Sequence, residues 1–390
     1  MKKYILLLVF MIPAIVHAQW KLCGKSQNSL ISGMTASNNN IFAATYGEGV
    51  LMSKNNGNSW EKVNNGLTNL DVQTIYSSDN IIYAGTAKGF FVSTDEGNSW
   101  EAKNTGLKSL SIQAITSNGN TIIAGTSGKG IFISTDYGGS WTEKNSGLEV
   151  LNVQSVAIHE NSIFAGTDNL TTGGIFVSTD KGNSWRPKNT GLTNIHVQKI
   201  VSNGNTIFAG TNDGVFLSTN DGNSWTKTNV SKTFVNSLAI NENIIVAGTT
   251  DGIFLSTNEG VKWIQKNSQL TELFVISTTI NSSTIFAGAI SGEIFKTTLS
   301  ELTDVDEETN TLSDNLQVFP QPALDIITIN CGKNISRSSE ETISIFNTLG
   351  EKVKTITANT SQILQINISE LSSGIYYLSR NNEIKMFVKQ

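Results

Sequence analysis

The stretch Ser93-Thr94-Asp95-Glu96-Gly97-Asn98-Ser99-Trp100 identifies the repeat of this protein, because related octapeptides recur along the 390-residue chain. The pattern Ser-x-Asp/Asn-x-Gly-x-x-Trp occurs six times, and neighbouring copies place their tryptophans 38 to 44 residues apart. The copies are Ser53–Trp60, Ser93–Trp100, Ser134–Trp141, Ser178–Trp185, Ser218–Trp225 and Ser256–Trp263. A second marker of the Ile-Phe-Ala-Gly-Thr type occurs seven times, with its alanine at Ala43, Ala84, Ala124, Ala165, Ala209, Ala247 and Ala287. The chain therefore contains seven repeat units.

Each unit contains four short β-type runs separated by Gly, Asn and Asp. In the fourth unit the runs are Val153–Ile158, Ile163–Thr167, Ile175–Ser178 and Ser184–Lys188. A single four-stranded antiparallel meander cannot bury both of its faces, so neighbouring units must stack. An all-β repeat of about 40–45 residues is typical of a β-propeller. The Trp-Asp and Gly-His dipeptides of WD40 repeats are missing, so the blades are of another kind.

The seventh unit has no tryptophan strand of its own after Glu293–Thr297. The segment Gln19-Trp20-Lys21-Leu22 supplies it, because Trp20 stands 40 residues before Trp60 and its neighbours are similar. Pairing the first strand with the last would remove two exposed sheet edges. We predict an all-β seven-bladed propeller over residues 19–298, closed by the N-terminal strand.

The repeated octapeptide resembles the Asp-box, or BNR, motif. Families that share it include sialidases, xyloglucan-cleaving glycosidases, sortilin-type receptors and photosystem II assembly factors. The resemblance implies the propeller fold, and it leaves the function open because one fold serves many functions.

The polar residue of each Asp-box is expected to accept backbone N–H bonds within its hairpin turn. These residues are Asn55, Asp95, Asp136, Asp180, Asn220 and Asn258. The tryptophans are expected to pack between blades, at Trp20, Trp60, Trp100, Trp141, Trp185, Trp225 and Trp263. The alternative is a calcium or ligand site at each box, but a calcium cage needs about 6–8 oxygens and these turns offer few carboxylates.

In the resembling families the Asp-box turns lie on the face away from the ligand site. The opposite face would carry the Asn-x-Gly-Leu loops and the turns before each third strand. Candidate ligand residues there are Glu48, Lys88, Lys129, Asp168, Asp213 and Asp251, with Gln73, Gln113, Gln154, Gln198 and Asn236 near the channel mouth. The structural alternative is that the aspartates are hairpin-turn residues and that the glutamines satisfy backbone groups between blades.

Composition and charge limit the function. The net charge of −5 excludes a basic nucleic-acid binder, and only 15% of residues are charged, which suits neutral polymers. Sialidases clamp a carboxylate with three arginines, whereas Arg186, Arg337 and Arg380 are the only arginines and cannot converge. We expect a non-catalytic binding or scaffold propeller for a glycan or protein. The alternative is a glycoside hydrolase that attacks a neutral polysaccharide through the channel-mouth carboxylates.

The N-terminal residues 1–18 have the pattern of a signal peptide, with Lys2 and Lys3 before an apolar run that ends at Val16-His17-Ala18. No later run is long enough to span a membrane. Cys23 and Cys331 are expected to be free thiols in separate domains, with a cross-domain disulfide as the minor alternative. The two cysteines, His159 and His196 do not cluster as zinc ligands, so we expect no metal and no cofactor.

The segment 299–315 breaks the repeat and is acidic, so we expect a linker. Residues 316–390 contain about seven short β-type runs, which predict a small Ig-like β-sandwich. The motifs Phe319-Pro320-Gln321-Pro322-Ala323, Ile345–Val353 and Ile368–Leu378, with the basic end Lys385–Lys389, resemble the type A sorting domain of type IX secretion. That resemblance implies the secretion machinery as a partner and the cell surface or medium as the destination. An ordinary adhesion module is the alternative.

Overall fold

The structure is a computed structural model that describes residues 20–169, 171–302, 317–319, 323, 325–330, 341–347, 351–358, 363–380 and 383–389. The chain divides into two compact units after Leu302. The predicted signal peptide, residues 303–315 of the predicted linker and Cys331 lie outside the described residues.

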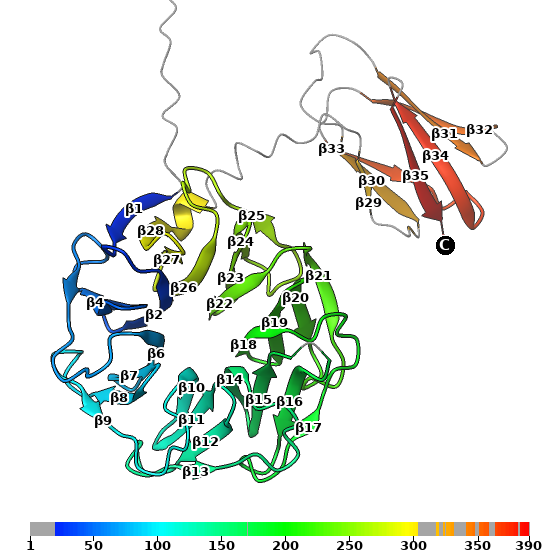
Figure 1. The fold of residues 1–390 in the computed structure, drawn as a ribbon. Coiled ribbons are helices and arrows are strands. Elements are labelled where there is room, and N and C mark those ends of the chain that lie inside the picture. The colour runs from blue at the N-terminus through cyan, green and yellow to red at the C-terminus, as the bar shows by residue number, and fades with distance from the viewer. Residues whose placement is uncertain are drawn as a thin grey trace, which may run out of the picture. The chain divides into compact units, whose positions relative to one another are not determined.

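The first unit contains seven four-stranded antiparallel sheets, which confirms the propeller fold. Figure 1 shows them set around a central axis. Within six blades the strands follow one another in chain order.

The strands of blades one to three are β2 (Ile31–Ser37), β3 (Asn40–Thr45), β4 (Gly49–Ser53), β5 (Glu61–Lys62), β6 (Val72–Ser78), β7 (Ile81–Thr86), β8 (Gly89–Ser93), β9 (Glu101–Ala102), β10 (Ile112–Asn118), β11 (Thr121–Thr126), β12 (Gly130–Ser134) and β13 (Thr142–Glu143). Those of blades four and five are β14 (Val153–His159), β15 (Ser162–Thr167), β16 (Gly174–Ser178), β17 (Arg186–Pro187), β18 (Val197–Asn203), β19 (Thr206–Thr211), β20 (Gly214–Ser218) and β21 (Thr226–Ser231). Blades six and seven consist of β22 (Val235–Asn241), β23 (Ile244–Thr249), β24 (Gly252–Ser256), β25 (Ile264–Gln265), β26 (Val275–Asn281), β27 (Thr284–Ala289), β28 (Glu293–Thr298) and β1 (Lys21–Lys25). Figure 1 shows β2, β6, β10, β14, β18, β22 and β26 innermost.

Blade seven joins the two ends of the repeat region. Strand β1 pairs antiparallel with β28, with Lys21 opposite Lys296 and Leu22 opposite Phe295. Figure 1 shows the blue β1 beside the yellow β28. The N-terminal segment thus completes the last sheet in the position that the sequence predicts for it.

The cores lie between neighbouring blades. The second strand of each blade, from β3 in blade one to β27 in blade seven, is almost fully buried because both faces of its sheet are covered. The resulting apolar clusters each combine residues of adjacent blades, as where Phe42 and Met52 of blade one meet Phe91 and Trp100 of blade two. The apolar cluster between blades six and seven also contains Leu302, so the compact unit extends beyond the expected boundary at residue 298.

A relay of indole hydrogen bonds links the blades. The Nε1–H of Trp100 donates to the carbonyl of Val63 at 2.8 Å, and Val63 stands three residues after Trp60. The equivalent bonds join Trp141 to Lys103, Trp185 to Lys144, Trp225 to Lys188, Trp20 to Lys266 and Trp60 to Cys23. Because the last two bonds both involve the N-terminal strand, it is held in the same way as the fourth strands of blades one to four.

Trp263 is the exception in this relay. Its indole N–H donates to Gly260 of its own Asp-box turn. In the preceding blade β21 is longer than the other fourth strands, and Asn229 there binds the backbone of Trp263 through both amide atoms: Nδ2 donates to the carbonyl and Oδ1 accepts from the N–H. At this boundary the side-chain amide of Asn229 therefore takes the place of the indole-to-carbonyl hydrogen bond that links the other blades.

The second unit contains two sheets. One orders β29 (Gln317–Phe319), β30 (Ile326–Asn330) and β33 (Ile363–Asn367), and the other orders β32 (Lys352–Ala358), β31 (Glu341–Asn347), β34 (Gly374–Arg380) and β35 (Glu383–Lys389). Ile327 and Ile329 of the first sheet share one buried cluster with Ile345, Leu378 and Phe387 of the second. The two sheets therefore form a small sandwich of short strands.

We expect Trp20→Ala to lower the free energy of unfolding by about 3–5 kcal/mol, because its ring is buried at the junction of the chain's ends. Trp60→Ala is the matched control and should cost less, because the Trp60 ring is only partly buried. Urea denaturation followed by circular dichroism measures both losses. A loss below about 1 kcal/mol for Trp20→Ala would contradict the closure.

Candidate ligand site

The Asp-box turns have a structural arrangement. In blade two Ser93 Oγ accepts the N–H of Gly97 and donates to Asp95 Oδ1, which also accepts the N–H of Ser99. The other five boxes repeat these bonds, and Asn55, Asn220 and Asn258 use their amide oxygens in the same way. The polar atoms of the box are thus occupied within the turn, as the structural interpretation predicts.

Hydrogen bonding makes the box aspartates more acidic. The hydroxyl of Ser134 and the N–H and hydroxyl of Ser140 lower the pKa of Asp136 to about 2. Ser184 and Ser178 lower the pKa of Asp180 to about 2 in the same way, and Ser99 lowers that of Asp95. The folded protein therefore favours the ionised form of these carboxylates.

The first strand of every blade carries a β-bulge near its start. The register shifts by one residue at the same point in all seven, between Val197 and Lys199 in blade five for example. The bulged residues are Ser32, Gln73, Gln113, Gln154, Gln198, Asn236 and Ile276. All seven line one cavity of about 360 Å³ in the central channel. The bulges therefore form a mainly amide and hydroxyl ring inside the propeller.

Several side chains of this ring join neighbouring blades. Asn236 Nδ2 donates to the carbonyl of Val275 at 2.9 Å, and Gln73 Oε1 accepts from the hydroxyl of Ser111 at 3.1 Å. Gln198 instead bonds to Asn212 at the turn before the third strand of its own blade. Gln113 Oε1 is buried without a hydrogen-bond partner in the described structure. The structural alternative therefore accounts for part of the ring and leaves Gln113 unexplained.

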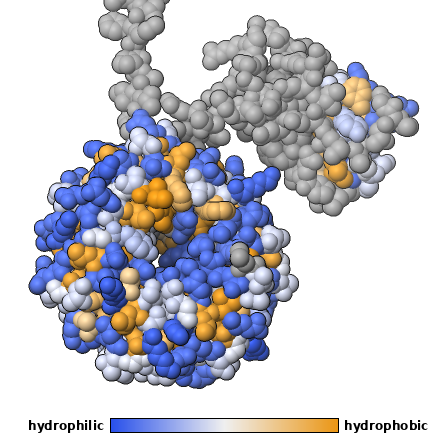
Figure 2. Space-filling view, viewed as in Figure 1, coloured by the Kyte–Doolittle hydropathy of each residue, from blue (hydrophilic) through white to orange (hydrophobic). Residues whose placement is uncertain are grey.

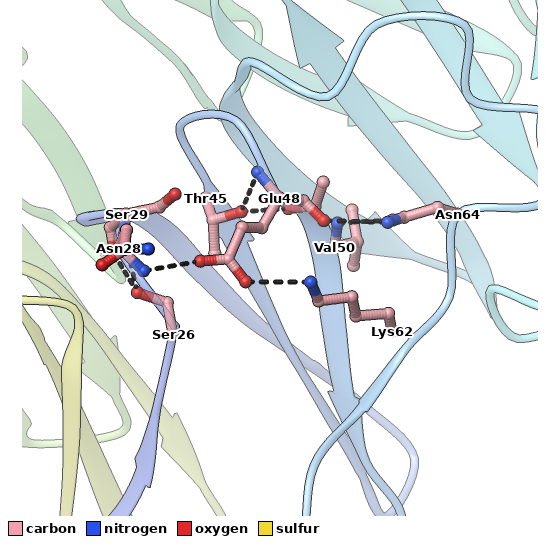
Figure 3. A network of polar contacts seen from close by, with 9 residues as sticks. Ser26, Asn28, Ser29, Thr45, Glu48, Val50, Lys62 and Asn64 are labelled. Atoms are coloured by element: carbon pink, nitrogen blue, oxygen red, sulfur yellow. Dashed lines mark hydrogen bonds and ion pairs between the residues drawn. The ribbon is translucent and has the colours of Figure 1, made fainter.

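Glu48 is held by the N-terminal segment and by its own blade (Figure 3). Its carboxylate accepts the N–H of Asn28 at 2.9 Å and forms an ion pair with Lys62 at 3.1 Å. Burial would raise the pKa of Glu48, but the Asn28 N–H and the Lys62 ammonium outweigh it, so that the pKa is lowered. Thr45 and Asn64 bond to its backbone. Glu48 thus fastens the segment between β1 and β2.

The other candidate carboxylates lie in separate blades and do not converge on the cavity. Asp168 Oδ1 lies 2.5 Å from His196 Nδ1 of the next blade, and Asp213 forms an ion pair with Lys227. The remaining candidates, Asp251, Lys88 and Lys129, are exposed on turns before the third strands. Among the residues that line the channel cavity, Lys199 is the only charged one.

Exposed apolar side chains stand just before the first strands. They are Leu70, Leu110, Leu151, Phe234 and Leu273, each between 37% and 52% exposed. The carbonyls of the first three accept N–H groups of Gly47, Gly89 and Gly130 in the neighbouring turns, which leaves the side chains to solvent. Figure 2 shows separate hydrophobic patches around a central hollow on the face in view.

Sequence reasoning missed Lys199 and these apolar residues. The Gln-Lys pair at 198–199 looks like ordinary alternation along a strand, and only the bulge places both residues at the channel. The recurrent apolar position two residues before most first strands was a usable signal, since Leu70, Leu110, Leu151 and Leu273 all occupy it.

Family models match both units of the chain. The model of the DUF6242 β-propeller domain matches residues 20–163 and 140–284. The chain belongs to the DUF6242 β-propeller family. The secretion system C-terminal sorting domain matches residues 317–390. This DUF6242 propeller is therefore exported by type IX secretion, to the cell surface or the medium. No curated protein matches the sequence.

Solved structures share the fold at low identity. YCF48 from Cyanidioschyzon merolae is 15% identical with a TM-score of 0.57, and the match covers 73% of this chain and 99% of that one. PorZ from Porphyromonas gingivalis is 15% identical with a TM-score of 0.56, over 94% of this chain and 60% of PorZ. The GH74 enzyme of Niastella koreensis is 20% identical with a TM-score of 0.56, over 70% of this chain and 43% of the enzyme. This chain thus spans only part of the latter two proteins.

Three further observations concern the described part of the chain. It contains no helix with the length and apolar character needed to cross a bilayer. Its His, Cys, Asp and Glu side chains form no group of three or more that could hold a metal ion. Cys23 is a free thiol, and burial raises its pKa to about 12.

We expect Glu48→Gln to destabilise the protein by about 1–3 kcal/mol, because it removes the charge of a carboxylate that is only 12% exposed, accepts the N–H of Asn28 and pairs with Lys62. Glu61→Gln is the control: Glu61 pairs with Lys54 in the open, so its loss should be at most about 1 kcal/mol. Urea denaturation of both variants provides the measurement. Equal losses would show that Glu48 does not fasten the segment.

Acid should weaken the propeller through the Asp-boxes. The folded pKa values of Asp95, Asp136 and Asp180 lie below the unfolded value of about 3.9, so their contribution is complete above about pH 4 and is lost as the pH falls towards 2. The triple variant to Asn keeps the amide acceptors that Asn55 already uses. Its melting temperature should fall less between pH 6 and pH 3 than that of the natural protein. An unchanged fall would contradict this origin of acid sensitivity.

Proposed function

We propose that the chain is an exported, non-catalytic binding propeller that recognises a glycan or a protein with the face opposite its Asp-boxes. The observation that carries this proposal is the ring of seven bulged residues around the channel cavity. Amides and hydroxyls at the mouth of a cavity of this size provide both donors and acceptors for a polar ligand. The exposed leucines and Phe234 add apolar contact area around them.

The carboxylates do not support hydrolysis. A two-carboxylate glycosidase needs its acid and its base or nucleophile about 5–10 Å apart, and the acid has a raised pKa. Glu48 has a lowered pKa and belongs to the first blade, whereas Asp168 of the fourth blade contacts His196 and Asp213 of the fifth blade forms an ion pair with Lys227. Each carboxylate is therefore engaged at a separate place on the rim.

The similar structures are compatible with more than one use of the fold. One YCF48 structure is described as bound to D1 peptide, and the Niastella protein is described as a GH74 enzyme. PorZ is described as an essential bacterial surface component of the type IX secretion system. Because their identities to this chain are 20% or lower, its own side chains carry the argument for binding.

The test is to probe the exported full chain on a glycan array and a peptide array, and to assay the same polysaccharides for released sugar. We expect binding without release of sugar. The double variant Leu110→Asp/Leu151→Asp should weaken that binding at least tenfold, because it places charges beside the channel mouth. The matched control is Val261→Asp, since Val261 is an exposed apolar residue of an Asp-box turn.

Two outcomes would contradict the proposal. One is sugar release by the natural protein, and its persistence in Asp168→Ala/Asp213→Ala/Asp251→Ala would place the chemistry elsewhere. The other is equal loss of binding in the Val261 control, which would locate the ligand away from the proposed face.

A further inference from the structure

Lys199 occupies a position that is small in every other blade. It follows the bulged residue of β18, and the residues at the same register in the other blades are Gly33, Thr74, Ala114, Ser155, Ser237 and Ser277. All three serines form hydrogen bonds between blades: Ser155 accepts the N–H of Ile200, Ser277 donates to the carbonyl of Ile31, and Ser237 bonds to Thr278. One blade therefore places a long cationic side chain where the others leave room.

The ammonium group of Lys199 has no carboxylate or hydrogen-bond partner among the described residues. It is the only charged side chain that lines the cavity. Burial lowers its pKa, because the channel removes water without supplying a negative charge. A partly buried cation without a partner gains most from an anion that enters the cavity and pairs with it.

We propose that the channel binds a small hydroxylated carboxylate of the uronic acid type, with Lys199 Nζ paired to the carboxylate and the bulge ring bonded to the hydroxyls. The proposal rests on the proposed binding function and names its ligand class. It differs from the neutral polymer that composition alone suggests, because the one charged group in the cavity is a cation.

The remaining features of the cavity fit a ligand of this size and polarity. Its volume of about 360 Å³ is at the small end of ligand pockets, which suits one sugar unit. Gln113 Oε1 is a buried acceptor that lacks a donor, and a ligand hydroxyl supplies one. A single ammonium among neutral amides matches a monoanion better than a phosphate, which carries more charge and needs several donors.

Binding of such an anion is linked to protonation. The carboxylate favours the charged form of Lys199 and so raises the pKa that burial had lowered. The complex therefore takes up protons, and the affinity falls as the pH rises because a neutral amine cannot pair with the anion.

The experiment is calorimetric titration of the exported full chain with galacturonate, galactose and inorganic phosphate at pH 6 and pH 9. Galacturonate should bind at least tenfold more tightly than galactose and phosphate, and less tightly at pH 9 than at pH 6. Lys199→Met should weaken galacturonate binding at least tenfold. Lys54→Met is the control, because Lys54 is exposed and lies beside an Asp-box.

Three results would overturn the proposal: no galacturonate binding at millimolar concentration, equal affinity in Lys199→Met, or phosphate binding as tight as that of galacturonate. If Lys199→Met does not fold, the preference of the natural protein for galacturonate over galactose decides, and equal affinity for the two sugars counts against Lys199. The galacturonate titration can fail while the Leu110→Asp/Leu151→Asp variant still loses array binding. That combination would refute only the carboxylate site and leave the proposed function intact.

Discussion

The hydrogen bond from six of the seven tryptophan indoles to a carbonyl of the preceding blade is the interaction on which the propeller depends. It joins a buried aromatic ring to a backbone group that would otherwise be left without a partner at a blade boundary. Trp20 and Trp60 carry this bond across the junction between the N-terminal strand and the rest of the ring. Because β1 also pairs with β28, the ring has no free edge at that point. The fold is therefore closed by the chain's own strand β1.

This architecture separates stability from recognition. Asp-box turns such as that of Asp95 occupy their polar groups internally, and the tryptophans bury the blade boundaries. Residues at the opposite ends of the blades can change without disturbing the Asp-box turns or the tryptophan packing. The bulges at the start of the first strands turn one or two side chains per blade towards the channel. A single change at such a position, as from serine to Lys199, alters the chemistry of the cavity while the ring remains intact.

Much of the fold follows from the sequence, because the repeat spacing defines the units and Trp20 stands one repeat before Trp60. The strand positions of both units were also predictable, since Gly, Asn and Asp mark the turns. The site was less predictable. A bulge changes which residues face the channel, and alternation of residue types does not reveal it, so Lys199 was missed. Glu48 looked like a rim ligand because its partner, the N–H of Asn28, belongs to an irregular segment distant in sequence. The departure of Trp263 from the relay depends on Asn229, which occupies the same repeat position as Asn64 and Asn104 but is not followed by their x-Gly-Leu loop.

Hydrogen exchange of the backbone amides of β1 tests the closure most directly. If the N-terminal strand completes blade seven, the amides of Lys21–Lys25 that pair with β28 should be protected to the same degree as those of β28 itself. Both segments can be followed by mass spectrometry on the exported full chain under native conditions. Exchange of β1 at the rate of a free peptide, while the other blades stay protected, would contradict the account.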